Sequence, residues 1–207
     1  MLEQKVDLKA ELACYRARRG TFTLVEVPAL QFLAVDGHGD PNTSPAYADA
    51  LAALYPLAYA VKFHSKKALG RDYVVMPLEA LWWAADMSAF TLARDKTRWS
   101  WTLLTLVPDW VGAADVATAR AAVARKGAPA RLDDVRLERL EEGLSVQTLH
   151  VGAYDDEGPV LRALHEEFLP AQSLRMTGRH HEIYLTDPRR TPAPRLRTIL
   201  RQPVARC

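Results

Sequence analysis

The sequence predicts an α+β fold in which a βαββ unit occurs twice, with antiparallel sheets and a central ligand pocket. Short segments rich in β-branched and aromatic residues alternate with segments of helical spacing. The order strand, Gly37, turn, helix, strand, strand recurs later in the chain as strand, Gly152, turn, helix, strand, strand. In each unit the helix covers one face of the sheet, and the other face must be buried against another part of the protein. We therefore expect the two units to join about a pseudo-twofold axis.

Composition favours a globular protein that does not bind nucleic acid directly. The chain has 207 residues, of which 49% are hydrophobic and 25% charged. The 27 basic and 25 acidic residues give a net charge of +2, and this balance lacks a nucleic-acid footprint. Cys14 and Cys207 form no paired framework, which favours a reduced setting. Without a signal peptide or an apolar run of about 18 residues, we expect a cytoplasmic protein with no membrane span.

The chain divides into a leader and two modules. We expect a helical leader over residues 1–20, a first βαββ module over 21–128 and a second over 129–207. The two modules together would form one compact ligand-binding domain. Residues 6–19 have helical spacing, and Gly20 ends the helix. This leader is too short for a helix-turn-helix.

The first module begins with two predicted strands, at 22–27 and 30–35. Ser44 followed by Pro45 predicts the start of a helix, because serine caps helices and proline suits the first helical position. Pro56 should kink or split this helix, since proline removes a backbone donor. The later elements of the module are a stop at Gly70, strands within 72–83 and 97–107, and a helix over 113–126.

The second module follows a predicted linker over 127–134. Its expected elements are two strands about a turn at Glu142-Gly143 within 135–152, a helix within 153–168, and strands at 180–185 and 196–204. Pro203 marks the last strand as an edge strand, because proline cannot donate to a sheet ladder.

The stretch HHEIYL, residues 180–185, reads as a strand with a carboxylate at its centre. Alternation places Glu182 and Tyr184 on one face and His181, Ile183 and Leu185 on the other. The face that carries Glu182 either meets solvent or lines a cavity. The strand alone favours solvent, because glutamate is almost never fully buried without a partner.

Five stretches of the chain carry a family resemblance: VDGHGDPN, LEALWWA, WSWTLLTLVPDWV, EGLSVQTLHVGAYDDEGP and HHEIYLTDPRR. With them the sequence resembles the gyrase-inhibitor-like small-molecule-binding proteins, which are related to effector domains of multidrug-responsive transcription regulators. The likeness covers nearly the whole chain. It implies the twofold βαββ fold and a central pocket for lipophilic, often cationic or planar, compounds.

The same resemblance implies residues for the pocket. Glu182 corresponds to the family's pocket carboxylate and Tyr154 to a pocket tyrosine. Some stand-alone members hydrolyse cyclopropane-bearing, DNA-alkylating compounds, and there the glutamate positions or activates water. Glu182 and Tyr154 are therefore the catalytic candidates. Ala153 and Pro56 depart from the commoner family pattern.

Aromatic side chains are the remaining candidates for ligand binding: Tyr55, Tyr59, Trp82, Trp83, Trp101, Tyr154 and Tyr184. Trp82 and Trp83 correspond to the family's double tryptophan, but alternation lets only one of them enter a pocket. Trp101 shares a strand face with Trp99 and could extend an aromatic wall. An acid among aromatic rings suits a cationic ligand.

Three functions stay open from the sequence. The first is binding of a lipophilic small molecule, the second is hydrolysis of an electrophilic cyclopropane by water that Glu182 activates, and the third is a protein-interaction role such as restraint of a topoisomerase. We expect a monomer or homodimer and no cofactor. A metal site is disfavoured, because Asp36, His38 and Asp40 suit an ordinary turn and adjacent His180 and His181 face opposite ways.

Overall fold

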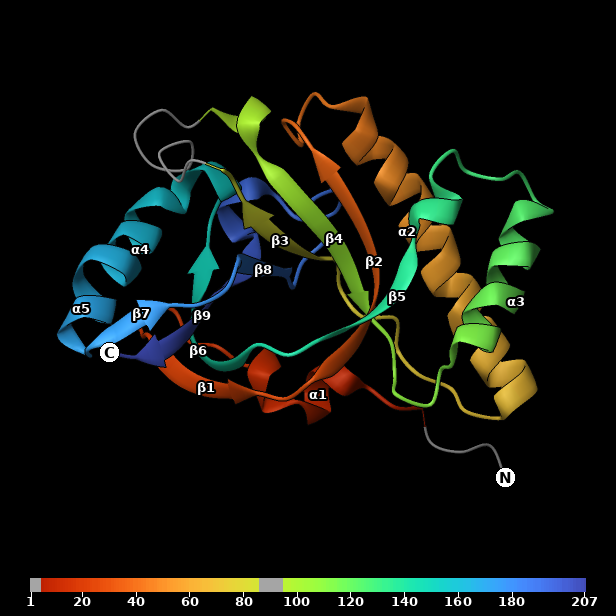
Figure 1. The fold of residues 1–207 in the computed structure, drawn as a ribbon, viewed down its shortest axis with the longest axis horizontal. Helices are drawn as coiled ribbons and strands as arrows, with labels where there is room; N and C mark the ends of the chain where they lie inside the picture. Colours follow the sequence, from red (N-terminus) through yellow and green to blue (C-terminus); the bar gives the residue numbers. More distant parts are fainter. Residues whose placement is uncertain (1–4, 86–94) are drawn as a thin grey trace.

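The computed structural model describes residues 5–85 and 95–207 and shows a mixed fold of helices and one large sheet (Figure 1). The strands are β1 (Thr23–Val27), β2 (Leu30–His38), β3 (Glu79–Trp83), β4 (Ser100–Leu106), β5 (Arg136–Leu140), β6 (Gly143–Val151), β7 (Leu174–Met176), β8 (His180–Tyr184) and β9 (Arg197–Arg206). The α-helices are α1 (Leu8–Glu11), α2 (Pro45–His64), α3 (Ala113–Ala124), α4 (Gly158–Arg162) and α5 (Leu169–Ala171). Residues 1–4 of the predicted leader and 86–94 of the first module lie outside the described residues.

The sheet confirms the predicted α+β class with antiparallel pairing. Its order is β1-β6-β9-β8-β3-β4-β2-β5, and β7 pairs with β9 beside this path. The order is symmetric about the β3–β8 pair, and β1 and β5 each pair with a strand from the other half of the chain. This arrangement suits a repeated βαββ unit whose first strands are exchanged. The repeat itself and the boundaries 21–128 and 129–207 stay predictions.

Helices cover the two ends of one sheet face. In Figure 1, α2 and α3 lie at one end and α4 and α5 at the other, with β3 and β8 between them. Residues of α2 and α3 pack with β2 and β4 in the largest core cluster. Leu164 and Leu169 pack with Val146 and Val204 in a separate cluster at the other end. The part of the sheet between the two clusters is where a ligand site can form.

The opposite sheet face, called the back face below, is covered by the N-terminal segment. Cys14 and Tyr15 are buried there with Leu81, Ile183 and Ile199. The prediction of one helix over 6–19 was wrong. The segment contains only the four-residue α1 and a 3-10 turn at Ala13–Tyr15, since its apolar side chains are used to pack an extended strap onto the sheet.

Helix α2 begins at Pro45 as predicted and continues through Pro56 without division. Ser44 stands at the N-cap but its side chain makes no capping hydrogen bond. A π-helical turn at Ser65–Leu69 follows α2, and Gly70 ends it with a left-handed φ of 71°. Buried residues on both sides of Pro56, such as Leu54 and Leu57, hold the whole helix on the sheet.

Strand β9 is not the edge strand that Pro203 indicated. It lies between β6 and β8, and its last residues pair with β7. The carbonyl of Pro203 accepts from Thr177 N (3.0 Å) on the side away from β6. Because N and C=O of a strand residue point the same way, the proline nitrogen faces Thr177, just past the end of β7, and the ladder with β6 loses no hydrogen bond.

Two other strand predictions need correction in detail. The expected strand at 72–83 begins only at Glu79, and before it Tyr73 makes an isolated parallel bridge to Val6. Strands β5 and β6 do flank the turn at Glu142-Gly143, but they do not pair with each other. Before the turn, β5 pairs with β2. After the turn, β6 pairs with β1 and β9.

Candidate ligand-binding site

A cavity of about 1750 Å³ lies on the helical face of the sheet. Its lining comes from α2, β3 and β8, from α4 with the π-helical turn Ala163–Phe168 that follows it, and from the segments 74–78 and 184–189. The volume exceeds that of most small-molecule pockets, which hold about 300–1000 Å³. The cavity therefore has room for a bulky ligand.

Strand β8 supplies the polar floor of this cavity. His180, Glu182 and Tyr184 line it, whereas His181 and Ile183 are buried on the back face. The predicted separation of Glu182 from His181 by strand alternation is confirmed. Leu185, just beyond the end of β8, packs against the back-face cluster as expected and also lines the cavity.

Among the described residues, the Glu182 carboxylate has few hydrogen-bond partners. Its side chain is only 13% exposed, and Tyr184 Oη donates a hydrogen bond of 2.7 Å to Oε2. His180 Nε2 lies 3.5 Å from Oε1, too far for a normal hydrogen bond. The cross-strand neighbours Ala80 and Leu200 are apolar and cannot donate. A ligand or a water molecule can therefore take up the remaining acceptor capacity of Glu182.

Tyr184 connects Glu182 to the aromatic wall. Trp82 Nε1 donates to Tyr184 Oη (3.1 Å), which in turn donates to Glu182. Burial, reinforced by the Glu182 charge, raises the pKa of Tyr184 well above its ordinary value. Burial also raises the pKa of Tyr154 to about 12. Both phenols therefore stay protonated near neutral pH and act as hydrogen-bond donors.

The aromatic wall consists of rings that contact one another along the cavity. Trp82 stacks on Tyr47 at a centroid distance of 6.4 Å and meets Trp99 edge to face at 5.6 Å. Tyr154 and Tyr184 meet edge to face at 5.4 Å. All five side chains line the cavity. Such rings favour flat, apolar or cationic ligands.

Tyr55 and Tyr59 stand at the cavity mouth, on α2. Tyr59 is 52% exposed, and the Arg189 guanidinium lies 5.9 Å from the Tyr55 ring centroid. Both tyrosines, predicted as ligand-binding candidates, line the cavity. Their contact with a ligand stays a prediction.

Trp83 and Trp101 do not line the cavity, so the ligand contacts predicted for them need correction. Trp83 points to the back face, where the Arg179 guanidinium lies 3.9 Å from its ring centroid. Trp101 is fully buried and fills the space over Gly37, where a Cβ atom would overlap its ring. Alternation along β3 explains the first placement, and the missing side chain of Gly37 explains the second.

Sequence reasoning missed several cavity residues, namely Tyr47, Glu157, His165 and His180 as part of the site. Tyr47 could have been found, because it continues the spacing of four residues that joins Tyr55 and Tyr59 on α2. Glu157 lies in a 3-10 turn region without periodicity, and it is only 4% exposed. Its position inside the stretch YDDEGP was the available signal.

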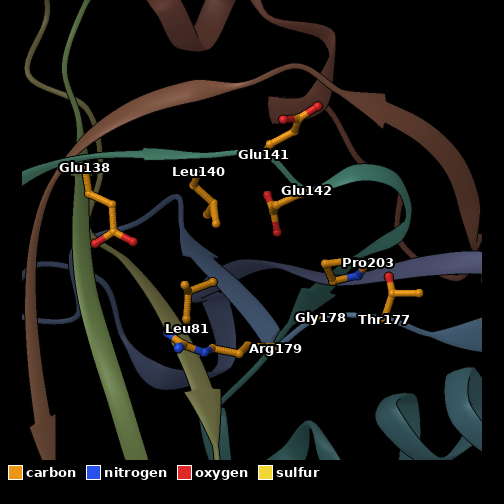
Figure 2. A pocket seen from close by; sticks show the side chains of 9 residues that line it. All are labelled: Leu81, Glu138, Leu140, Glu141, Glu142, Thr177, Gly178, Arg179 and Pro203. Carbon is orange, nitrogen blue, oxygen red and sulfur yellow. The ribbon is translucent and has the colours of Figure 1, made fainter.

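A second, smaller recess of about 320 Å³ lies on the back face (Figure 2). Figure 2 shows Glu138, Leu140 and Glu142 along one side and Leu81 and Arg179 along the other. Glu142 is 4% exposed; its carboxylate accepts from His181 Nδ1 (3.0 Å) and from Arg201 (2.8 Å). The recess therefore ends on a carboxylate whose charge is already balanced.

Behind this recess lies a buried ion network. His181 Nε2 lies 3.0 Å from Glu79 Oε2, and Tyr15 Oη donates to Glu79 Oε1 (2.6 Å). Burial alone lowers the pKa of His181, but Glu142 and Glu79 outweigh it and raise that pKa to about 9. Burial alone raises the pKa of Glu142, but His181 and Arg201 lower it to about 2. The network therefore holds charged groups in fixed pairs.

Neither a metal-binding cluster nor a membrane-spanning helix occurs in the described part of the chain. Within residues 5–85 and 95–207, no group of three or more His, Cys, Asp or Glu side chains is placed to hold a metal ion. Among the helices of the described chain, none combines the length and the apolar character needed to cross a bilayer.

A helix-covered antiparallel sheet with a large aromatic cavity and a central carboxylate has the architecture of a small-molecule-binding domain. Residues 21–205 match the GyrI-like small molecule binding domain, and the chain belongs to this family. The resemblance drawn from the sequence is thereby confirmed. No curated protein sequence matches the chain.

Solved structures similar to the chain include two proteins from Listeria innocua, described first, and a domain of EcmrR. An uncharacterized conserved protein is 36% identical, with a TM-score of 0.88 over 97% of this chain and 100% of that chain. A protein described as a hydrolase is 34% identical, with a TM-score of 0.85 over 98% of this chain and 100% of that chain. The C-terminal domain of EcmrR is 10% identical, with a TM-score of 0.55 over 90% and 98% of the two chains, and shares the fold alone.

Proposed function

We propose that the cavity binds a lipophilic small molecule, planar or cationic, and that Glu182 is its central polar contact. The observation that supports this proposal is that the Glu182 carboxylate has unused hydrogen-bond acceptor capacity among the described residues. Glu182 is 13% exposed and lies among aromatic rings, and its hydrogen bond from the described residues comes from Tyr184. A flat ligand can stack on Trp82 while a positive or hydrogen-donating group meets Glu182.

A hydrolase is the second candidate, and the similarity to hydrolase-described proteins from Listeria innocua over almost the full chain favours it. For a strained cyclopropane, a water oxygen would attack a ring carbon while Glu182 accepts a proton from that water. The ring C–C bond breaks, its electron pair moves to the other carbon or a group conjugated with it, and a proton returns there. Tyr154 and Tyr184 would donate to the developing negative charge.

Binding and turnover can be measured on the same protein. Trp82 and Trp99 lie in the cavity, so ligand binding should quench tryptophan fluorescence. A cyclopropane-bearing alkylator is added, quenching is followed, and the products are analysed by mass spectrometry. Glu182→Gln is compared with Glu141→Gln, a matched change at an exposed acid of the back recess.

Each outcome selects one function. Saturable quenching without product, weakened by Glu182→Gln but not by Glu141→Gln, supports the binding module. Formation of the water adduct, lost in Glu182→Gln, supports the hydrolase. Absence of both contradicts the two proposals, and recovery of a topoisomerase by pull-down would then favour the protein-interaction role expected from the sequence.

A further inference from the structure

Two histidines form a polar end of the cavity that the proposed function does not use. His180 lies on β8, two residues before Glu182 and on the same face. His165 comes from the other side, in the π-helical turn Ala163–Phe168. Gln202 of β9 also lines the cavity at this end. The cavity therefore has hydrogen-bonding groups besides Glu182 and the tyrosines.

His180 is held in the cavity with its ring nitrogens unused. Its side chain is only 10% exposed, and neither nitrogen has a hydrogen-bond partner among the described residues. Strand register places the ring opposite Trp82, on the cavity face of the sheet. Buried polar groups in proteins almost always have partners, so this ring indicates a contact that a ligand completes.

His165 repeats this pattern from the helical side. Its Nε2 atom is buried and has no hydrogen-bond partner in the described part of the chain. The π-helical turn widens the helix at this point, and such turns are frequent at functional sites. Burial and the nearby charge of His180 lower the pKa of His165 to about 4, and a hydrogen-bonding interaction with the Gln202 side chain opposes this shift in part. The ring is therefore neutral near pH 7 and can donate from one nitrogen.

An imidazole N–H selects a different group from the one that Glu182 selects. A carboxylate attracts a cation or a hydrogen donor, whereas an imidazole N–H donates to an uncharged oxygen. A site built to hydrogen-bond a ligand oxygen strongly rejects the analogue that lacks it, since its buried polar groups then stay unpaired. The imidazoles and the Glu182 carboxylate therefore recognise different groups, which lie close together on one ligand because His180 Nε2 is 3.5 Å from Glu182 Oε1.

We propose that His165 and His180 form a hydrogen-bond donor site for an uncharged carbonyl oxygen of the ligand, an inference that rests on the proposed binding function. The ligand class is thereby an aromatic, lipophilic ketone or related carbonyl compound whose oxygen lies at the α4 end of the cavity. Its ring system stacks on Trp82, the strand partner of His180.

The test uses two planar probes of the same shape, 9-fluorenone and fluorene, which differ in a carbonyl and a methylene group. Their dissociation constants are measured by tryptophan quenching and by titration calorimetry. The wild-type protein should bind fluorenone about tenfold or more tightly than fluorene, in line with one good hydrogen bond. His165→Leu and His180→Leu should each reduce this ratio toward one by weakening fluorenone binding alone.

Two further variants guard against loss of folding. His180→Gln keeps an N–H donor and should retain part of the preference for fluorenone. His64→Gln changes a histidine outside the cavity, paired with Asp115, and should leave the ratio unchanged. Circular dichroism checks that each variant is folded.

The outcomes separate this inference from the proposed function. Equal affinity of the wild-type protein for both probes, or a preference that survives both leucine variants, overturns the donor site and leaves the binding function intact. Failure of both probes to bind contradicts the binding function and, with it, the donor site.

Discussion

The two faces of β8 carry the same residue types and use them in opposite ways. On the cavity face, His180 and Glu182 are 10% and 13% exposed and lie 3.5 Å apart. On the back face, His181 is fully buried, with Glu79 and Glu142 each 3.0 Å from one of its nitrogens. Close pairing balances the charges on the back face, whereas the cavity face leaves hydrogen-bonding capacity unused. The first arrangement holds the fold and the second suits a ligand.

This comparison also bears on how a site is recognised. Strongly shifted pKa values often mark functional sites, yet structural ion pairs shift them too. Here the raised pKa of His181, about 9, belongs to the back face, where every charge is matched. The cavity, the aromatic wall and the incomplete hydrogen bonding of Glu182 and His180 are the better indicators.

The largest expected difference between the faces is in stability. His181→Leu leaves Glu79 and Glu142 buried without their shared cation, and should lower the free energy of unfolding by about 3–5 kcal/mol. His180→Leu removes a ring that makes no hydrogen bond with the described residues, and should change the free energy of unfolding by no more than about 1 kcal/mol. Urea denaturation measures both. Similar losses in the two variants would contradict the assignment of the network to the fold.

The pH dependence of stability should follow the back face. The folded-state pKa of His181 is raised from 6.5 to about 9, so its contribution is complete below about pH 6.5 and is lost as the pH rises toward 9. The shift corresponds to roughly 3 kcal/mol. Thermal melts between pH 6 and 10 measure it, and His181→Leu should lack this alkaline loss. An equal alkaline loss in that variant would place its origin elsewhere.

The acid side of the same network has the opposite sign. The folded-state pKa of Glu142 is lowered from 4.5 to about 2, so its contribution is complete above about pH 4.5 and is lost as the pH falls toward 2. Because Glu142 and His181 share one interaction, the two effects are not additive. Melts of Glu142→Gln between pH 2 and 6 should show a shallower acid loss than the wild-type protein.

A smaller effect is expected where the cavity face does have hydrogen bonds. Tyr184→Phe removes the donor to Glu182 and the acceptor of Trp82 Nε1, and should cost about 1–2 kcal/mol of unfolding free energy. It should also weaken ligand binding, because Glu182 loses its orienting partner. Tyr59→Phe, a matched change at the exposed rim, should leave stability unchanged.

The smallest stability effect belongs to Glu182 itself. Glu182→Gln keeps an acceptor for Tyr184 and should change the free energy of unfolding by less than about 0.5 kcal/mol, while ligand affinity or turnover falls. Denaturation and quenching on the same sample measure both. A large loss of stability would mean that Glu182 belongs to the fold, as His181 does.

Local patterns in the sequence predicted which residues lie on each face of β8, but not the contacts that these residues make with distant parts of the chain. Alternation along HHEIYL separated Glu182 and Tyr184 from His181 and Ile183, because the strand period depends on the backbone alone. The role of His181 depends on groups far away in the chain. Glu142 is 39 residues from it, and Tyr15 is 64 residues from Glu79. No local pattern encodes such pairs.

The same reason explains the other corrections. Trp101 is buried because Gly37, opposite it on β2, leaves space for the ring, and that register is set only when the strands pair. Pro203 was read as an edge residue because the sequence does not show that the partner of β9 changes from β8 to β7 at that point. The family resemblance, by contrast, identified Glu182 and Tyr154, which both line the cavity.

The exchange of β1 and β5 between the halves has a consequence for how such a chain can be divided. Strand β1 pairs with β6, and β5 pairs with β2. Each half of the chain therefore lacks the strand that pairs with the outer edge of its own part of the sheet. A gene cut near residue 128 would yield two fragments with open sheet edges, prone to aggregate separately and able to restore the sheet when expressed together.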